Sequence, residues 1–422
     1  MAEPTISSPK PPLMPLDEAL ARLVEVASAR RIADSQDLPT AQTLGRVLAA
    51  PVVSSLDVPP ADNSSMDGFA LRFADLSPDV VLPVSQRIAA GAVGKPLEAG
   101  TAARIFTGAP IPPGADTVVM QEQCEPLAID APEERARVRV TGPVEAGQWI
   151  RRRGEDVVHG STVLAAGTRL TPQALGLAAS VGAATLQVLR RPRVALFSTG
   201  DELVMPGDPL PPGAIYNSNR FTLRALLEAA GCEVDDLGIV PDKLEATREA
   251  LRRAAQGNDL IITSGGVSVG EEDHLKPAVQ AEGRLDLWQM AIKPGKPLAF
   301  GAVHREKGEA LFIGLPGNPV SSFVTFLLAV APVLRALQGL PSALPRGLPL
   351  PAGFDWPKPD KRREFLRVRL NEQGELALFA NQSSGVLTSA VWADGLVDNP
   401  PGQAIAKGDT VRFLPLSMLV GA

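Results

Sequence analysis

The chain has 422 residues, too many for a single hydrophobic core, so two to four domains are expected. Its net charge of −6 argues against general nucleic-acid binding, and the basic runs at 151–153 and 361–363 are too short to change that. With two cysteines and three histidines, neither a disulfide framework nor a zinc site of the usual spacing is supported, and we expect Cys124 and Cys232 to be inert thiols.

The first part of the chain reads as a tail followed by helices. Residues 1–15 are rich in proline and have no apolar core, so they predict a disordered tail and no signal peptide. Leu16, Leu20 and Leu23 recur at helical spacing and predict an amphipathic helix beginning near residue 17. We expect another short helix over 44–50.

A β domain is predicted inside this helical region. Residues 55–159 consist of short β-like runs separated by glycine and proline, the pattern of a small β domain. Thr171-Pro172 then restarts a helix. We therefore assign 16–54 and 160–190 to one elongated, discontinuous helical domain that carries the β domain as an insert.

The rest of the chain predicts an α/β domain and a second β domain. Between 191 and 341, strand-like runs alternate with helical patterns, which predicts a doubly wound parallel sheet. A proline-rich linker follows, and the runs in 342–422 predict a small β barrel or sandwich. The fold class is thus multidomain α/β plus β, with no internal repeat.

The most informative stretch is 259–274, DLIITSGGVSVGEEDH with its preceding neighbour Asn258. An uncharged run typical of a strand buried on both faces ends at Ser264-Gly265-Gly266. The loop that follows contains Ser268 and Gly270 and ends in three acidic residues, the last of which is Asp273. Ligands of open α/β sheets bind where such strands end. Backbone N–H groups and the two serine hydroxyls could hold an anion there, and the acids could hold the cation that it attracts. An ordinary strand-to-helix turn is the alternative.

Two further segments favour an anion site. The run 311–323 is broken by Pro316-Gly317-Asn318-Pro319, and Pro319 suits the first position of a helix. The N–H groups of Val320 and Ser321 are expected to point at a ligand. The long uncharged stretch that follows is interrupted by prolines and predicts a buried core helix. Lys293 and Lys296 flank Pro294-Gly295, and together the three segments suggest a phosphorylated substrate, although each alone could be a turn or a solvated lysine.

Several common sites are excluded. The glycines at 265–270 lack the spacing of a dinucleotide fingerprint, and the Walker lysine is missing. No serine lies in a nucleophile elbow. With no thiolate or imidazole cluster, any metal should be oxygen-bound, which favours Mg²⁺.

Motifs along nearly the whole chain closely resemble the molybdopterin molybdenumtransferases, the MoeA and gephyrin E-domain family. The stretches that carry the resemblance are DNSSMDGFA, RIFTGAPIPPGAD, IRRRGEDV, VALFSTGDEL, TSGGVSVGEED, IKPGKP and GLPGNPVS. The resemblance implies an enzyme that takes adenylylated molybdopterin and molybdate, places the oxyanion on the dithiolene sulfurs and releases AMP with the help of Mg²⁺.

The resemblance also implies site residues, each of which could instead be a turn former or a helix cap. The positions expected to be catalytic are Asp67, Thr107, Asp156, Glu202, Asp242, Asp273 and Lys293, of which Glu202, Asp242 and Asp273 are expected to hold the metal. The positions expected to bind the pterin substrate are Thr199, Gly200, Ser264, Gly265, Gly266, Ser268, Gly270, Lys296, Pro316, Gly317, Asn318, Pro319 and Ser383. Phe69, His274 and Gln289 depart from the family pattern, and Gln289 stands where a cationic contact is expected.

Partners and location are likewise implied by the resemblance. In the family the β insert of one subunit faces the α/β domain of the other, so a homodimer is expected. An upstream adenylyltransferase and downstream molybdoenzymes or chaperones are expected partners, in the cytoplasm, with no nucleic acid and no membrane. Two other functions stay open: the related adenylyltransferase step on molybdopterin and a non-catalytic scaffold. The four-domain layout disfavours the former, and the lack of a dedicated peptide groove disfavours the latter.

Overall fold

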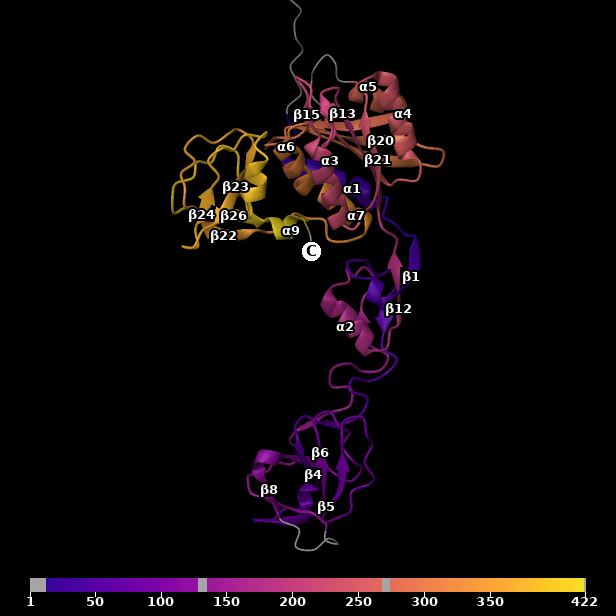
Figure 1. Ribbon diagram of the computed structural model, residues 1–422, viewed down its shortest axis with the longest axis vertical. Helices are drawn as coiled ribbons and strands as arrows, with labels where there is room; N and C mark the ends of the chain where they lie inside the picture. The colour runs from indigo at the N-terminus through magenta and orange to yellow at the C-terminus, as the bar shows by residue number, and fades with distance from the viewer. Residues whose placement is uncertain (1–12, 128–134, 268–273, 421–422) are drawn as a thin grey trace, which may run out of the picture. The chain divides into compact units, whose positions relative to one another are not determined.

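The computed structural model describes residues 13–127, 135–267 and 274–420 (Figure 1). The chain divides into two compact units, each with its own core. Unit 1 contains residues up to Gln36, the segment Gly45–Ala49 and everything from Val188 onward, and unit 2 contains Asp37–Leu44 and Ala50–Gln187.

A six-stranded sheet forms the centre of unit 1. Its order is β16 (Glu233–Val240), β13 (Arg193–Thr199), β17 (Leu260–Ser264), β21 (Glu309–Leu315), β20 (Pro297–His304) and β18 (Gly283–Gln289). The first four strands are parallel, and β20 and β18 join antiparallel. Because parallel strands end at the same edge, the loops after β13, β17 and β21 come together there.

Helices cover both faces of this sheet, as the predicted doubly wound fold requires. They are α1 (Leu16–Ser28), α3 (Ser218–Ala229), α4 (Leu244–Ala255), α5 (Leu275–Glu282), α6 (Pro319–Thr325) and α7 (Ala331–Leu337). Within β13, Val194 and Leu196 pack in the core that holds α1, α3 and the α6–α7 helix, whereas Ala195 and Phe197 pack in the core that holds α4 and α5. This alternation is the period of two of a strand buried on both faces.

The helix from Pro319 to Leu337 is continuous, because the π-helical segment η4 (Phe326–Val330) joins α6 to α7. Among the described residues it alone is long and apolar enough, by length and composition, to cross a membrane. Its most apolar window is 89% buried inside the protein. It is therefore placed as a core helix, as predicted.

The end of the chain forms a second six-stranded sheet, which confirms the predicted β structure there. The main path is β19 (Ile292–Lys293), β23 (Arg363–Leu370), β25 (Gly395–Asn399), β26 (Thr410–Pro415) and β22 (Leu348–Pro351), and β24 (Leu376–Leu378) pairs with β23. The short helices α8 (Thr388–Trp392) and α9 (Leu416–Val420) accompany it. Since β19 belongs to this sheet, Lys293 is held beside the C-terminal β region.

Unit 2 contains the predicted second helical segment and the β insert. Thr171 caps α2 (Pro172–Ser180) by accepting a hydrogen bond from the Ala174 N–H at 3.3 Å. The insert is a sheet in the order β7 (Thr117–Met120), β4 (Gly68–Leu71), β6 (Ala102–Ile105), β5 (Val81–Ile88), β9 (Arg137–Val140) and β8 (Cys124–Leu127). Unit 2 also contains the short pairs β2 (Val52–Val53) with β11 (Thr162–Leu164) and β3 (Asn63–Ser64) with β10 (Ile150–Arg151). Elsewhere β1 (Ser35–Pro39) pairs with β12 (Thr185–Leu189), and β14 (Leu203–Val204) with β15 (Ile215–Tyr216).

The helix predicted over 44–50 is wrong. Gly45 has φ +74°, and Leu48 instead forms a bridge with Val188. The N–H of Leu189 donates to the Val47 carbonyl at 2.8 Å. Val47 and Leu48 are therefore both buried as neighbours in bridged backbone, and the segment pairs with the chain near Val188 in place of forming a helix.

Candidate functional site

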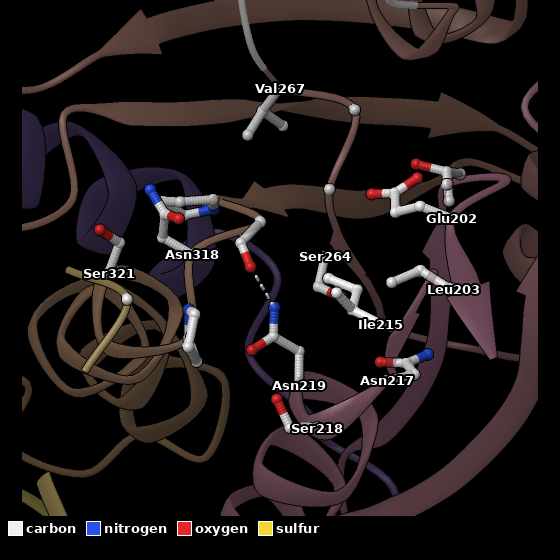
Figure 2. A pocket seen from close by; sticks show the side chains of 18 of the residues that line it. Glu202, Leu203, Ile215, Asn217, Ser218, Asn219, Ser264, Val267, Asn318 and Ser321 are labelled. Carbon is white, nitrogen blue, oxygen red and sulfur yellow. Dashed lines mark hydrogen bonds between the residues drawn. The ribbon is translucent and has the colours of Figure 1, made fainter. Parts of the chain in front are cut away.

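A cavity of about 640 Å³ lies at the edge of the unit 1 sheet where β13, β17 and β21 end. That volume is typical of small-molecule sites. Figure 2 shows Glu202, Leu203 and Asn217 on one side of it and Asn318 and Ser321 on the other. Eleven residues expected in the site line this cavity: Thr199, Gly200, Glu202, Asp242, Ser264, Gly265, Gly266, Pro316, Gly317, Asn318 and Pro319.

The loop after β17 requires its two glycines. Gly265 has φ +88°, and a Cβ atom there would lie 2.6 Å from the Thr199 carbonyl oxygen. Gly266 has φ +66°, and a Cβ atom would lie 2.8 Å from the Thr199 Oγ1. The loop thus passes directly over the end of β13, with its backbone open toward the cavity. The Ser264 hydroxyl is buried and shares a 3.0 Å hydrogen bond with that of Ser198.

Two carboxylates line the cavity from the loops that follow β13 and its neighbour β16. Gly200 has φ +146°, and a Cβ atom there would lie 2.6 Å from an oxygen of Glu202, so this carboxylate folds over the glycine. The N–H of Asp242, which follows β16, donates to the Asp201 carboxylate at 3.1 Å. Glu202 and Asp242 therefore approach from neighbouring loops and both line the cavity.

Glu202 and Asp242 are two of the three residues expected to hold a metal, and both line this cavity. Across the described residues no group of three or more His, Cys, Asp or Glu is placed to hold a metal ion. The third expected ligand, Asp273, lies outside the described residues, as do Ser268 and Gly270. Cys124 and Cys232 are free, and burial raises their pKa values to about 11 and about 12, which fits the inert thiols expected there.

The loop between β21 and α6 forms the opposite wall. Asn219 Nδ2 donates to the Gly317 carbonyl at 2.8 Å, which ties the loop to α3 (Figure 2). Pro319 is the first residue of α6, as predicted. The expectation that the Val320 N–H points at a ligand is wrong, because this group donates to the Ser384 carbonyl at 3.0 Å. The Val320 N–H is thus hydrogen-bonded to a segment more than sixty residues further along the chain.

The N-terminal end of α3 supplies residues that the sequence analysis missed. Asn217 caps the helix by accepting from the Arg220 N–H at 3.1 Å. Asn217 Nδ2 and Thr199 Oγ1 are buried and have no hydrogen-bond partner among the described residues, a state that a polar ligand would relieve. The missed lining residues nearest to α3 are Leu203, Ile215, Tyr216, Asn217, Ser218 and Asn219. The run Asn217-Ser218-Asn219 before an amphipathic helix is a capping signal that could have located this end.

A second cavity, of about 290 Å³, holds Lys293 and Ser383 away from the glycine loops. Lys293 Nζ lies 3.1 Å from the Glu364 carboxylate and 3.5 Å from that of Asp360. Lys296 is exposed and lines neither cavity, although the next residue, Pro297, lines the first.

The second cavity also contains a buried arginine. Arg367 is 1% exposed, and its guanidinium donates to the Ser389 hydroxyl at 3.2 Å and to the Phe365 and Ser383 carbonyls at 3.2 and 3.3 Å. None of its partners within the described residues is a carboxylate. Burial lowers the pKa of Arg367 to about 10, so the group keeps its charge at neutral pH. It presents a positive charge to this cavity.

Unit 2 brings two of its three expected residues together. Asp67 Oδ1 accepts hydrogen bonds from the Thr107 N–H at 2.8 Å and from the Thr107 hydroxyl at 2.7 Å. These two bonds hold the pKa of Asp67 below its ordinary value. Asp156 is exposed, and its N–H donates to the Val58 carbonyl at 3.0 Å. Phe69 is buried, with the Arg104 guanidinium 5.1 Å from its ring centroid.

Comparison with known proteins covers nearly the whole chain. Residues 14–182 match the MoeA N-terminal region (domain I and II), residues 195–336 a probable molybdopterin binding domain, and residues 349–416 the MoeA C-terminal region (domain IV). The chain is 38% identical over 420 residues to a molybdopterin molybdenumtransferase of Haemophilus influenzae, covering 97% of this chain and 100% of that protein. It is 39% identical over 390 residues to molybdopterin molybdenumtransferase 2 of Mycobacterium tuberculosis, covering 89% and 93%. The crystal structure of a molybdopterin biosynthesis MoeA protein from Pyrococcus horikoshii matches with a TM-score of 0.79 at 28% identity, covering 95% and 99%.

Proposed function

The chain belongs to the MoeA family of molybdopterin molybdenumtransferases, and on that premise we propose that it inserts molybdate into adenylylated molybdopterin and releases AMP. The observation that carries this proposal is the main cavity, where two glycine loops and the start of α3 meet. Such a site suits a substrate with a phosphoanhydride, because backbone N–H groups and a helix N-terminus favour negative charge.

Some residues of the main cavity bind the substrate, and others neutralise its charge. The Gly265-Gly266 loop has no side chains, so the phosphates can approach its backbone closely, and Thr199 Oγ1 and Asn217 Nδ2 can donate hydrogen bonds to them. Glu202 and Asp242 offer the oxygen ligands that Mg²⁺ prefers. When bound, Mg²⁺ would neutralise charge on the phosphate that leaves with AMP.

The second cavity suits the oxyanion that is inserted. Arg367 is buried and charged and has no carboxylate partner among the described residues. Ser383 and Lys293, the latter paired with Glu364, line the same space. A tetrahedral dianion would supply the missing counter-charge. We assign molybdate to this cavity.

Assembly and location complete the proposal. The protein acts as a homodimer in the cytoplasm, receives its substrate from an adenylyltransferase, and passes the product to molybdoenzymes or their chaperones. Asp67, Thr107 and Asp156 serve the reaction from unit 2, in the arrangement of the dimer that the family resemblance implies. Light scattering tests the dimer: a stable, fully active monomer would exclude it.

The deciding experiment incubates purified protein with adenylylated molybdopterin, molybdate and Mg²⁺ and follows AMP release together with cofactor formation. AMP release is expected to depend on molybdate. Rapid release without any oxyanion, and with no cofactor formed, would contradict the proposal. Formation of adenylylated molybdopterin from molybdopterin and ATP would instead assign the adenylyltransferase step.

A matched pair of variants tests the role of Glu202. Glu202→Gln removes a cavity carboxylate and is expected to lower turnover by ~10²-fold, the effect of losing one well-placed electrostatic group. Glu228→Gln removes an exposed carboxylate of α3 that bonds Arg224 outside the cavity and should leave turnover unchanged. Added Mg²⁺ should partly restore Glu202→Gln. Equal activity of the two variants would remove Glu202 from the metal site.

A further inference from the structure

Unit 2 contains an arginine that the chemistry above leaves without a role, although it lies close to the Asp67–Thr107 pair. Arg104 is on β6, and its hydrogen bonds go to neutral groups. No carboxylate among the described residues forms an ion pair with it. In contrast, Arg139 on β9 of the same sheet pairs with a glutamate at 2.7 Å, as is usual for an exposed arginine.

The Arg104 guanidinium bonds two segments that adjoin Asp67. Its Nη1 donates to the Gly68 carbonyl at 3.0 Å, and its Nη2 donates to Gln121 Oε1 at 2.7 Å. Gln121 begins the 3-10 helix η3 (Gln121–Gln123), and its N–H donates to the Asp67 carbonyl at 3.0 Å. The carbonyls of Asp67 and of the next residue are therefore both fixed, the first by Gln121 and the second by Arg104.

Two aromatic rings contact the same guanidinium. The Cζ atom of Arg104 lies 5.1 Å from the ring centroid of Phe69 and 4.8 Å from that of Phe106. A planar guanidinium can stack on aromatic faces while its N–H groups donate hydrogen bonds at its edge. Since Phe106 directly precedes Thr107, this contact holds the chain on the other side of the Asp67–Thr107 pair.

We propose that Arg104 is a positioning residue for the reaction: it holds the backbone on both sides of the Asp67–Thr107 pair and thereby fixes the direction of the Asp67 carboxylate. The inference rests on the proposed function, in which this pair takes part. Thr107 donates two hydrogen bonds to Oδ1 of Asp67, and no described residue donates to Oδ2. Oδ2 is therefore the oxygen that a substrate can meet, and its place depends on the segments that Arg104 holds.

The charge of Arg104 adds an electrostatic effect to this geometry. The hydrogen bonds from Thr107 lower the pKa of Asp67 most, and the positive charge of Arg104 lowers it further. Substitution can separate the two contributions. Lysine keeps the charge but replaces the planar fork with a single nitrogen, whereas glutamine removes the charge as well.

The test compares Arg104→Lys and Arg104→Gln with the wild type and with Arg139→Lys, the matched control on the same sheet. Arg104→Lys is expected to lower kcat by roughly tenfold or more, because a small misplacement of a reacting group can cost up to ~10²-fold. KM for adenylylated molybdopterin should change little. In both Arg104 variants the pKa of Asp67 should rise in a carboxyl NMR titration, and the Thr107 amide should exchange faster with solvent deuterium. Arg139→Lys should change none of these quantities.

A second perturbation leaves Arg104 in place. Gln121→Ala removes the acceptor of the 2.7 Å bond but keeps the backbone donor to Asp67, and Gln121 is exposed, so the fold should survive. This variant should lower kcat and raise the pKa of Asp67, each by less than Arg104→Lys does. A normal kcat and an unchanged pKa of Asp67 in Gln121→Ala would overturn the inference whether or not the Arg104 variants fold.

The NMR measurements need no substrate, so they separate this inference from the proposed function. A raised pKa of Asp67 and faster Thr107 exchange in Arg104→Lys support the positioning role even if the wild-type protein inserts no molybdate. A raised pKa in Arg104→Gln alone would assign Arg104 a purely electrostatic effect and overturn the inference. A lower Tm with normal kcat, pKa and exchange, or a lower kcat with unchanged NMR measurements, would also overturn it, the first in favour of a structural role and the second in favour of direct contact with substrate.

Discussion

Substitution of Gly265 by alanine should destabilise unit 1 far more than the same substitution at a glycine of similar backbone conformation. Gly265 has φ +88°, and the added Cβ would lie 2.6 Å from the Thr199 carbonyl oxygen. Thr199 ends β13, which is paired on both sides by β16 and β17, so its backbone cannot retreat without breaking pairs. We therefore expect about 1–2 kcal/mol for the positive φ and about 1–3 kcal/mol for the overlap.

Gly257→Ala is the matched control. Gly257 has φ +80°, and nothing lies within 4 Å of the position that a Cβ would take, so only the conformational cost of about 1–2 kcal/mol applies, as at Gly265. In scanning calorimetry Gly257→Ala should lower Tm by about 2–8 °C and Gly265→Ala by about two to three times as much. Gly265→Ala should also weaken AMP binding, whereas Gly257→Ala should not. Equal losses of Tm in the two variants would show that the loop does not lie against Thr199.

Two other predictions concern hydrogen bonds at the site. Asn219→Ala removes the 2.8 Å bond to the Gly317 carbonyl and should cost about 1 kcal/mol of stability and weaken AMP binding; normal AMP affinity would show that α3 does not position this loop. Thr107→Val keeps the backbone donor to Asp67 but removes the hydroxyl donor, so the pKa of Asp67 should rise part of the way toward about 3.9 in a carboxyl NMR titration. Because the folded-state pKa of Asp67 is lowered, the ionised carboxylate contributes its full stabilisation above about pH 3.9, and this stabilisation is lost as the pH falls through the folded-state pKa. In Thr107→Val the folded-state pKa is higher, so the loss of stability should begin at a higher pH. An unchanged pKa would mean that the Thr107 hydroxyl does not donate to Asp67.

The sequence by itself determined the local parts of the fold. A run of branched apolar residues ended by glycine, such as 260–266, predicts a buried strand followed by a sharp turn. Strands that alternate with amphipathic helices bury their apolar surfaces together in a doubly wound sheet. Pro319 and Thr171 marked helix starts because their effects act within one turn of the chain. Both starts are confirmed.

Only the tertiary structure decided which of these parts meet. Val320, expected to offer its N–H to a ligand, is instead bonded to Ser384, and Lys293 lies with Arg367 in a cavity separate from the glycine loops. Segment 44–50 pairs with residues near Val188 in place of forming a helix. In each case the partner lies far along the chain. The spacing of residues within one segment does not indicate which backbone group or side chain of a distant segment will contact that segment. Pairing at long range follows from the packing of whole elements, and this packing overrides a helical pattern of only a few residues.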